Sequence, residues 1–329
     1  MGNSIVIAEP TADGAACAVM ALRASGSTPD TFFVSSQKLA DLFSSGTPGR
    51  SSASPSVIIC GLGVVHTSWD GRVLRPHLMQ SLRDIASPIR WFSPRRWRSE
   101  DRTAVANIIG VERLVVAPDS SCAAELIADF YAGQMGEDAK ALVQMAGGKG
   151  NGSAPDWVGR WRRVIAALRD RPSQIRPAIE PLVAGNPAGL DAGFLERAEA
   201  VEQTNRDTAA QLAGDPIAMR QHTLTCLAIP GERHAFWREI SQYARAVRGT
   251  DFSLCRLVGR PVLVLSRDEE ERVDLRQWSR YVTDVIPAAR AVEPRPERIP
   301  FYVQGLAEDP GLMDDVVRAL KEGAHLIGD

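Results

Sequence analysis

Short runs of β-branched and apolar residues alternate with longer amphipathic stretches through the first 120 residues. The runs are typical of buried strands, and the stretches between them are typical of helices. We expect strands at 4–8, 31–35, 57–60, 89–92 and 113–116, and helices at 15–24, 36–43 and 76–85. Strands that alternate with helices at this spacing form a parallel sheet with both faces covered. The pattern therefore predicts an α/β fold for this part of the chain.

The pattern becomes helical between about residue 120 and residue 214. Tryptophan and aliphatic residues recur at helical spacing over 154–170, which predicts an amphipathic helix packed on its apolar side. After the break at Gly185-Asn186-Pro187, a long helix is expected at 190–212.

Mixed structure returns in the last third of the chain. Strands are expected at 223–229 and 261–266, and helices at 233–247 and 313–322. We therefore predict a larger α/β domain over 1–185, a helical connector over 186–215 and a smaller α/β domain over 216–329.

Composition and charge narrow the function classes. The 329 residues are 44% hydrophobic and 24% charged, as in folded proteins, and the net charge of −2 gives no overall attraction to nucleic acid or anionic membrane. No apolar run is long enough to span a bilayer, and the start lacks the pattern of a signal peptide. We expect a cytoplasmic protein with no membrane partner. The five cysteines are scattered without a CxxC pair, so we expect buried free thiols rather than a zinc site.

Three expected strands end in segments that could carry chemistry. These segments are Glu9–Gly14, Cys60–Gly63 and Ser93–Arg95. In a doubly wound sheet, ligands bind at the carboxyl ends of the strands. We therefore expect the three segments to meet at one edge of the sheet.

The three segments resemble the metal-binding motifs of the DHH/DHHA1 phosphoesterase superfamily, which includes RecJ-like proteins. The first family motif is a strand followed by His-Pro-Asp-Ala-Asp-Gly, and this chain keeps the proline and Ala12-Asp13-Gly14 but has Glu9 and Thr11 in place of the His and the first Asp. The second family motif has an Asp before Leu-Gly, where this chain has Gly61. The third, Asp-His-His, corresponds to Ser93-Pro94-Arg95.

The C-terminal part resembles the DHHA1 substrate-binding domain. The resemblance is carried by 261–267, which ends in Ser266-Arg267, and by Val273-Asp274-Leu275. It implies that Arg267 contacts substrate phosphate; the alternative is an ion pair with Asp268 or Glu271. The family's glycine-rich run corresponds to 284–290, where the glycines and the histidine are absent.

The substitutions change what the resemblance implies about metal. Two neighbouring divalent ions need several carboxylates and imidazoles to offset their charge. Of the expected ligands only Asp13 remains in a matching position, with Glu9 as a second potential ligand. No cofactor is therefore expected, and no catalytic residue is assigned.

Arginines are concentrated where the third motif would be. They are Arg90, Arg95, Arg96, Arg98 and Arg102. Arginine forks bind phosphate oxygens without metal, so the former metal pocket could hold a phosphate directly. The alternative is a solvated loop whose arginines pair with Glu100, Asp101 and Asp13; most basic residues of this chain are arginine, which lowers the weight of any one cluster.

Two functions follow from these residues. The first is a catalytically degenerate phosphoesterase-like protein that binds a phosphate-bearing small molecule, a nucleotide or single-stranded nucleic acid, or that acts as a scaffold for a protein partner or a second copy. Its predicted ligand-binding residues are Arg95, Arg96, Arg98 and Arg267. The alternative is a divergent phosphoesterase or exonuclease that hydrolyses phosphodiesters or polyphosphate. It would hold one Mn²⁺ or Mg²⁺ with Asp13 and either Glu9 or Asp119.

Overall fold

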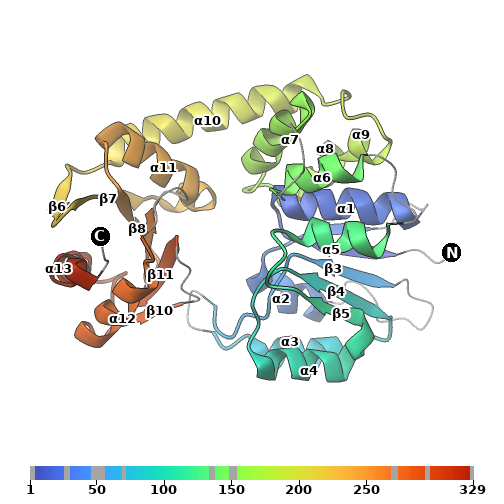
Figure 1. Cartoon of the computed structure of the whole chain (residues 1–329), viewed down its shortest axis with the longest axis horizontal. Coiled ribbons are helices and arrows are strands. Elements are labelled where there is room, and N and C mark those ends of the chain that lie inside the picture. The colour runs from blue at the N-terminus through green and yellow to red at the C-terminus, as the bar shows by residue number, and fades with distance from the viewer. Residues whose placement is uncertain are drawn as a thin grey trace. The chain divides into compact units, whose positions relative to one another are not determined.

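The computed structural model describes residues 4–25, 30–45, 56–68, 72–132, 138–147, 154–267, 273–292 and 297–326 (Figure 1). The chain divides into two compact units, Met1–Ala200 and Val201–Asp329. The division falls inside the long helix α10 (Ala192–Leu212). No helix in the described part of the chain combines the length and the apolar character needed to cross a membrane.

The described residues of the first unit form a parallel sheet of five strands. They are β1 (Ile5–Ala8), β2 (Thr31–Phe33), β3 (Val57–Cys60), β4 (Ile89–Ser93) and β5 (Leu114–Val116), in the order β2-β1-β3-β4-β5. Each lies where the apolar runs predicted a strand, with ends that differ by at most two residues. Every residue of β1 and β3 is buried, because both faces of the sheet are covered.

Helices cover the sheet on both sides (Figure 1). The helices of this unit are α1 (Ala12–Ser25), α2 (Leu39–Ser44), α3 (Arg75–Arg83), α4 (Ser99–Ile109), α5 (Ala123–Phe130), α6 (Ala139–Ala146), α7 (Asp156–Ala167), α8 (Ile175–Ala178) and α9 (Glu180–Val183). The face covered by α2, α3 and α4 holds one core, in which Ile59, Trp91, Leu78 and Val105 pack together. The expected packed helix over 154–170 is confirmed as α7, with Trp161 buried.

The arginine-rich segment is not a single loop. Arg90 lies in β4, Arg98 directly precedes α4, and Arg102 lies within α4. Helix α4 was not predicted, because its sequence Ser-Glu-Asp-Arg-Thr opens with polar residues that resemble a loop. Its apolar stripe, which includes Val105 and Ile109, becomes informative only when the sheet beneath it is known.

In the second unit, the described residues form a mixed sheet of six strands. They are β6 (Ile217–Met219), β7 (His222–Ile229), β8 (Phe252–Leu257), β9 (Val262–Arg267), β10 (Ala289–Ala291) and β11 (Arg298–Val303), in the order β10-β11-β9-β8-β7-β6. Among the described strand pairs of this sheet, only β7 and β8 are parallel. The sequence pattern predicted β7 and β9 but not the other four strands, which are short or carry polar residues and proline.

Helices α11 (Trp237–Arg248), α12 (Arg276–Val285) and α13 (Leu312–Glu322) pack on this sheet. The main core of the unit joins the sheet to α12 and α13 through Trp278, Val282, Val316 and Leu320. This core contains none of the residues that form the core of the first unit. The chain therefore builds two separate hydrophobic interiors.

Candidate functional site at the strand ends of the first unit

The three motif segments meet at one edge of the parallel sheet, as predicted. Strands β1, β3 and β4 are neighbours, and they end at Ala8, Cys60 and Ser93. Gly61 has a φ of +74°, and a Cβ at this position would lie 3.6 Å from Asp13 Oδ2 and 3.9 Å from Glu9 Cβ. Gly61 therefore faces both acidic residues of the first motif, and it contributes no side chain there.

Asp13 is held by the start of another helix. Its Oδ1 accepts a hydrogen bond from the backbone N–H of Ala124 at 2.9 Å, and its Oδ2 accepts one from the N–H of Ala123 at 3.0 Å. Both donors belong to the first turn of α5, whose N–H groups have no partner within the helix. Asp13 therefore caps α5 from a position 110 residues earlier in the chain.

Asp13 is partly buried and lies beside cysteine thiols. Burial raises the pKa of the Asp13 carboxyl, and the two backbone N–H groups oppose part of that rise. Cys17 Sγ lies 3.7 Å from Asp13 Oδ1, and burial raises the pKa of Cys17 well above its usual value. Burial also raises the pKa of Cys122 to about 11. In the absence of a metal ion, these thiols remain protonated near neutral pH.

Glu9 is paired with an arginine from the third motif. Arg95 Nη2 lies 2.6 Å from Glu9 Oε1, and both side chains are about a quarter exposed (23% and 27%). The arginine reaches Glu9 across Gly63, where a Cβ would lie 3.1 Å from Arg95 Cδ. A guanidinium group therefore lies beside the one motif carboxylate that no backbone group caps.

Ser93 organises the turn that carries Arg95. Its buried hydroxyl oxygen accepts hydrogen bonds from the backbone N–H of Arg95 at 3.3 Å and from Trp97 Nε1 at 3.1 Å. Trp97 in turn packs edge to face against Trp91, with ring centroids 5.0 Å apart. Ser93, which stands in place of the first Asp of the family's third motif, thus stabilises the turn through these two hydrogen bonds.

The structure does not pair the other predicted arginines of this region with Glu9 or Asp13. Arg96 is exposed and makes no ion pair in the described part of the chain. Arg98 lies 3.8 Å from Glu100, with both side chains mostly exposed. Arg267 belongs to the second unit, at the end of β9, and its expected partners Asp268 and Glu271 lie outside the described residues.

Of the pairs in the solvated-loop alternative, Arg98 lies near Glu100, whereas Asp101 has partners outside the arginine-rich segment. Asp101 is buried and accepts a hydrogen bond from Arg75 Nε at 2.6 Å, with His66 Nε2 2.7 Å from its other oxygen. These three residues come from the loop after β3, the start of α3 and the first turn of α4. No sequence motif indicates this cluster, because Arg75 and His66 lie 26 and 35 residues from Asp101.

Comparison with known proteins rests on structure. No protein-family model matches the chain, and no curated protein matches it in sequence. Among solved structures, a DHH domain described as a member of a family of ribosomal proteins aligns over 100% of this chain and 88% of its own, with a TM-score of 0.64 and 14% identity.

Two further solved structures also align with this chain. RecJ from Thermus thermophilus in complex with Mn²⁺ aligns over 99% of this chain and 52% of its own, with a TM-score of 0.62 and 12% identity. The pGpG-specific phosphodiesterase PggH from Vibrio cholerae aligns over 99% of this chain and 100% of its own, with a TM-score of 0.53 and 14% identity. At such low identity the likeness concerns the fold. This α/β chain therefore has the two-domain fold of DHH-domain proteins and RecJ.

Proposed function

We propose that this chain is a phosphoesterase-like protein without the family's metal centre, and that it binds a phosphate-bearing ligand directly. The observation that carries the proposal is that both motif carboxylates already have partners within the chain. Glu9 is neutralised by Arg95, and both oxygens of Asp13 accept hydrogen bonds from α5.

This donor set does not fit a pair of divalent cations. Such a pair needs several anionic ligands around it, and the second and third motifs supply a glycine, a serine, a proline and an arginine. In the described residues, the one group of three potential ligand side chains close enough to share an ion is His66, Glu100 and Asp101. That group does not include Glu9 or Asp13, and Asp101 is already paired with Arg75.

The charge beside the strand ends favours an anionic ligand. Arg96 and Arg98 are exposed next to the turn that carries Arg95, and guanidinium groups bind phosphate oxygens in pairs. The solved structures of similar fold include a pGpG-specific phosphodiesterase, whose name concerns a dinucleotide, and a RecJ described as an exonuclease. A nucleotide or short single-stranded nucleic acid is therefore the ligand class we propose, held without a metal ion.

The test combines binding with metal and turnover measurements on one preparation. We expect a labelled single-stranded oligonucleotide or pGpG to bind equally well with Mn²⁺ and with EDTA, and to bind less tightly as salt rises. We expect no hydrolysis of pGpG, oligonucleotides or polyphosphate. Arg96→Ala and Arg98→Ala should each weaken binding by about fivefold, the effect of about 1 kcal/mol for an exposed ion pair.

The matched control is Arg318→Ala, which removes an exposed arginine of α13 that pairs with Asp315. Its affinity should equal that of the unmodified chain. Tightly bound manganese together with manganese-dependent hydrolysis would overturn the proposal and favour the divergent enzyme. If neither Arg96→Ala nor Arg98→Ala changed the affinity, the ligand would bind elsewhere than at this edge of the sheet.

A further inference from the structure

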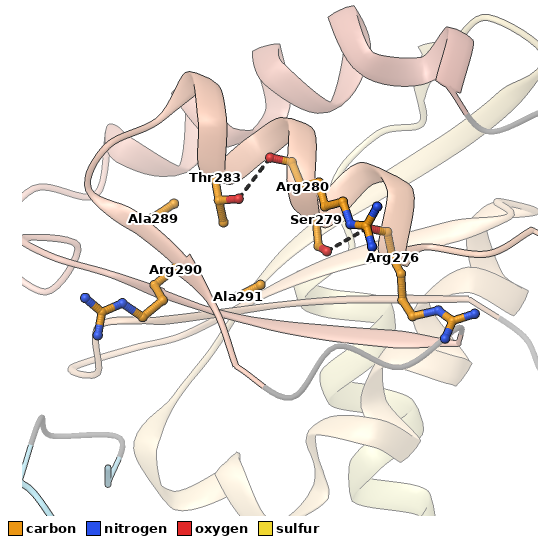
Figure 2. A pocket seen from close by; sticks show the side chains of 7 residues that line it. All are labelled: Arg276, Ser279, Arg280, Thr283, Ala289, Arg290 and Ala291. Carbon is orange, nitrogen blue, oxygen red and sulfur yellow. Dashed lines mark hydrogen bonds between the residues drawn. The ribbon is translucent and has the colours of Figure 1, made fainter. Parts of the chain in front are cut away.

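The second unit has a sheet edge that no other described strand covers. Strand β10 is the last in the sheet order and pairs only with β11. Helix α12 lies beside it, and the two elements line a groove of about 390 Å³. Figure 2 shows Arg276, Ser279, Arg280 and Thr283 on the helix and Ala289, Arg290 and Ala291 on the strand.

The register of β10 decides which backbone groups face outward. The N–H of Val292 donates to Pro300 O at 2.8 Å, and the N–H of Gln304 donates to Ala288 O at 2.9 Å. Arg290 is paired with Tyr302 between these two bonded pairs, so its backbone groups also face β11. The N–H and C=O of Ala291 therefore point away from the sheet, where a further strand would pair.

The walls of the groove leave that edge accessible. Ala289 and Ala291 contribute only methyl groups, and both pack on the core of the unit. The Ser279 hydroxyl donates to Arg276 O at 2.8 Å, and the Thr283 hydroxyl donates to Arg280 O at 2.9 Å. The two hydroxyls thus donate to their own helix rather than to the backbone of β10.

The groove is positively charged. Arg276 is held by Asp274, with Nε 2.9 Å from Oδ1. Arg280 and Arg290 have no carboxylate partner in the part of the chain that the structure describes. Figure 2 shows the guanidinium groups of Arg276 and Arg290 on opposite sides of the groove.

We propose that an extended acidic segment of a partner protein binds in this groove by adding to β10 as a further strand. The backbone of Ala291 supplies the strand pairing, and Arg280 and Arg290 select acidic side chains. A second copy of this chain is a poorer occupant, because pairing β10 with itself would bring two Arg290 side chains onto neighbouring strands. The proposal is independent of the proposed ligand of the first unit.

The test uses the whole chain and three labelled hexapeptides in fluorescence anisotropy. Glu-Val-Glu-Val-Glu-Val should bind, Lys-Val-Lys-Val-Lys-Val should not, and Glu-Pro-Glu-Pro-Glu-Pro should bind at least fivefold more weakly than the first. The proline peptide keeps the charge of the first but lacks every second backbone N–H, so it can pair with a strand along one edge only. On binding of the first peptide, hydrogen exchange should slow in the segment that contains Ala291.

Two kinds of variant separate charge from strand pairing. Arg280→Ala and Arg290→Ala should each weaken binding of the first peptide by about fivefold. Ala291→Pro removes the outward N–H without breaking a bond to β11, and it should weaken binding by about tenfold. Circular dichroism and the melting temperature check that each variant folds, and Arg318→Ala is the control.

The outcomes that would overturn the proposal are distinct. Equal affinity of Ala291→Pro and the unmodified chain would exclude strand addition. Displacement of the peptide by millimolar inorganic phosphate would identify a simple anion site. Absence of binding by all three peptides would also reject the proposal, and none of these results bears on the oligonucleotide measurement.

Discussion

At the scale of single residues, Asp13 shows that a matching motif position can serve another purpose. Its carboxylate lies at the place the resemblance assigns to a metal ligand, yet both of its oxygens hold the first turn of α5. A loss of activity in Asp13→Ala would therefore be ambiguous, because removal of a helix cap costs about 0.5–2 kcal/mol of stability. Measurement of bound metal distinguishes metal binding by Asp13 from capping of α5 better than this variant does.

The titration of Asp13 gives a prediction about stability and pH. Burial raises the pKa of the folded-state carboxyl above its ordinary value of 3.8, so the folded chain binds this proton more readily than the unfolded chain. The contribution of Asp13 to the free energy of unfolding is therefore largest below pH 3.8, and it falls as pH rises through the folded-state pKa. Asp13→Asn has no such titration.

The measurement is the free energy of unfolding by urea for both proteins, from about pH 4 to about pH 7.5, a range that begins near the ordinary pKa of Asp. We expect the stability of the unmodified chain, relative to Asp13→Asn, to decrease as pH rises. Groups that titrate elsewhere cancel in this difference. A relative stability that increases with pH would mean that the two N–H groups of α5 outweigh the cost of burying the charge.

At the scale of elements, a polar cluster joins α11 to the middle of the second sheet. Arg245 is buried on α11, and its Nη1 donates to Ser253 Oγ of β8 at 2.9 Å and to Ser266 Oγ of β9 at 3.1 Å. Ser241 Oγ, one turn earlier on α11, lies 2.6 Å from Ser253 Oγ. The cluster fixes where α11 lies on the sheet, because a buried guanidinium needs oriented acceptors.

Removal of one hydroxyl from this cluster should be costly. Ser253→Ala takes an acceptor away from Arg245 in a fully buried place, and we expect the free energy of unfolding of the second unit to fall by about 1–3 kcal/mol. Thr283→Ala is the control, because its hydroxyl bonds only to a carbonyl of its own helix, and we expect a change within about 0.5 kcal/mol. Urea unfolding curves compare the two, and equal effects would mean that the cluster contributes nothing specific.

At the scale of the whole molecule, the two separate cores predict two unfolding transitions. Leu263 is fully buried in the second unit and Ile59 is fully buried in the first. Each Ala substitution at these positions should lower the stability of its own unit by about 2–5 kcal/mol and leave the other nearly unchanged. Urea-dependent hydrogen exchange, read separately for peptides of each unit, makes the measurement. A single transition that both substitutions lower equally would show that the units unfold together.

The sequence predicted the parallel sheet better than the mixed one. Apolar runs such as 57–60 correspond to strands buried on both faces, where nearly every side chain must be apolar. Strand β10 has three residues and β11 contains Pro300, so neither gives a strand pattern. Both are strands because neighbouring strands supply their hydrogen bonds, β11 for β10 and β9 for β11.

The sequence was sufficient to predict the α/β class and the position of the three motif segments at strand ends, because local hydrophobic periodicity identifies strands. It also determined which side chains replace the expected metal ligands. The folded structure was needed to show that Arg95 pairs with Glu9, that Asp13 caps α5 and that β10 is an edge strand among the described strands. These contacts join residues as many as 111 positions apart. No local pattern encodes them, since they depend on how the completed elements pack.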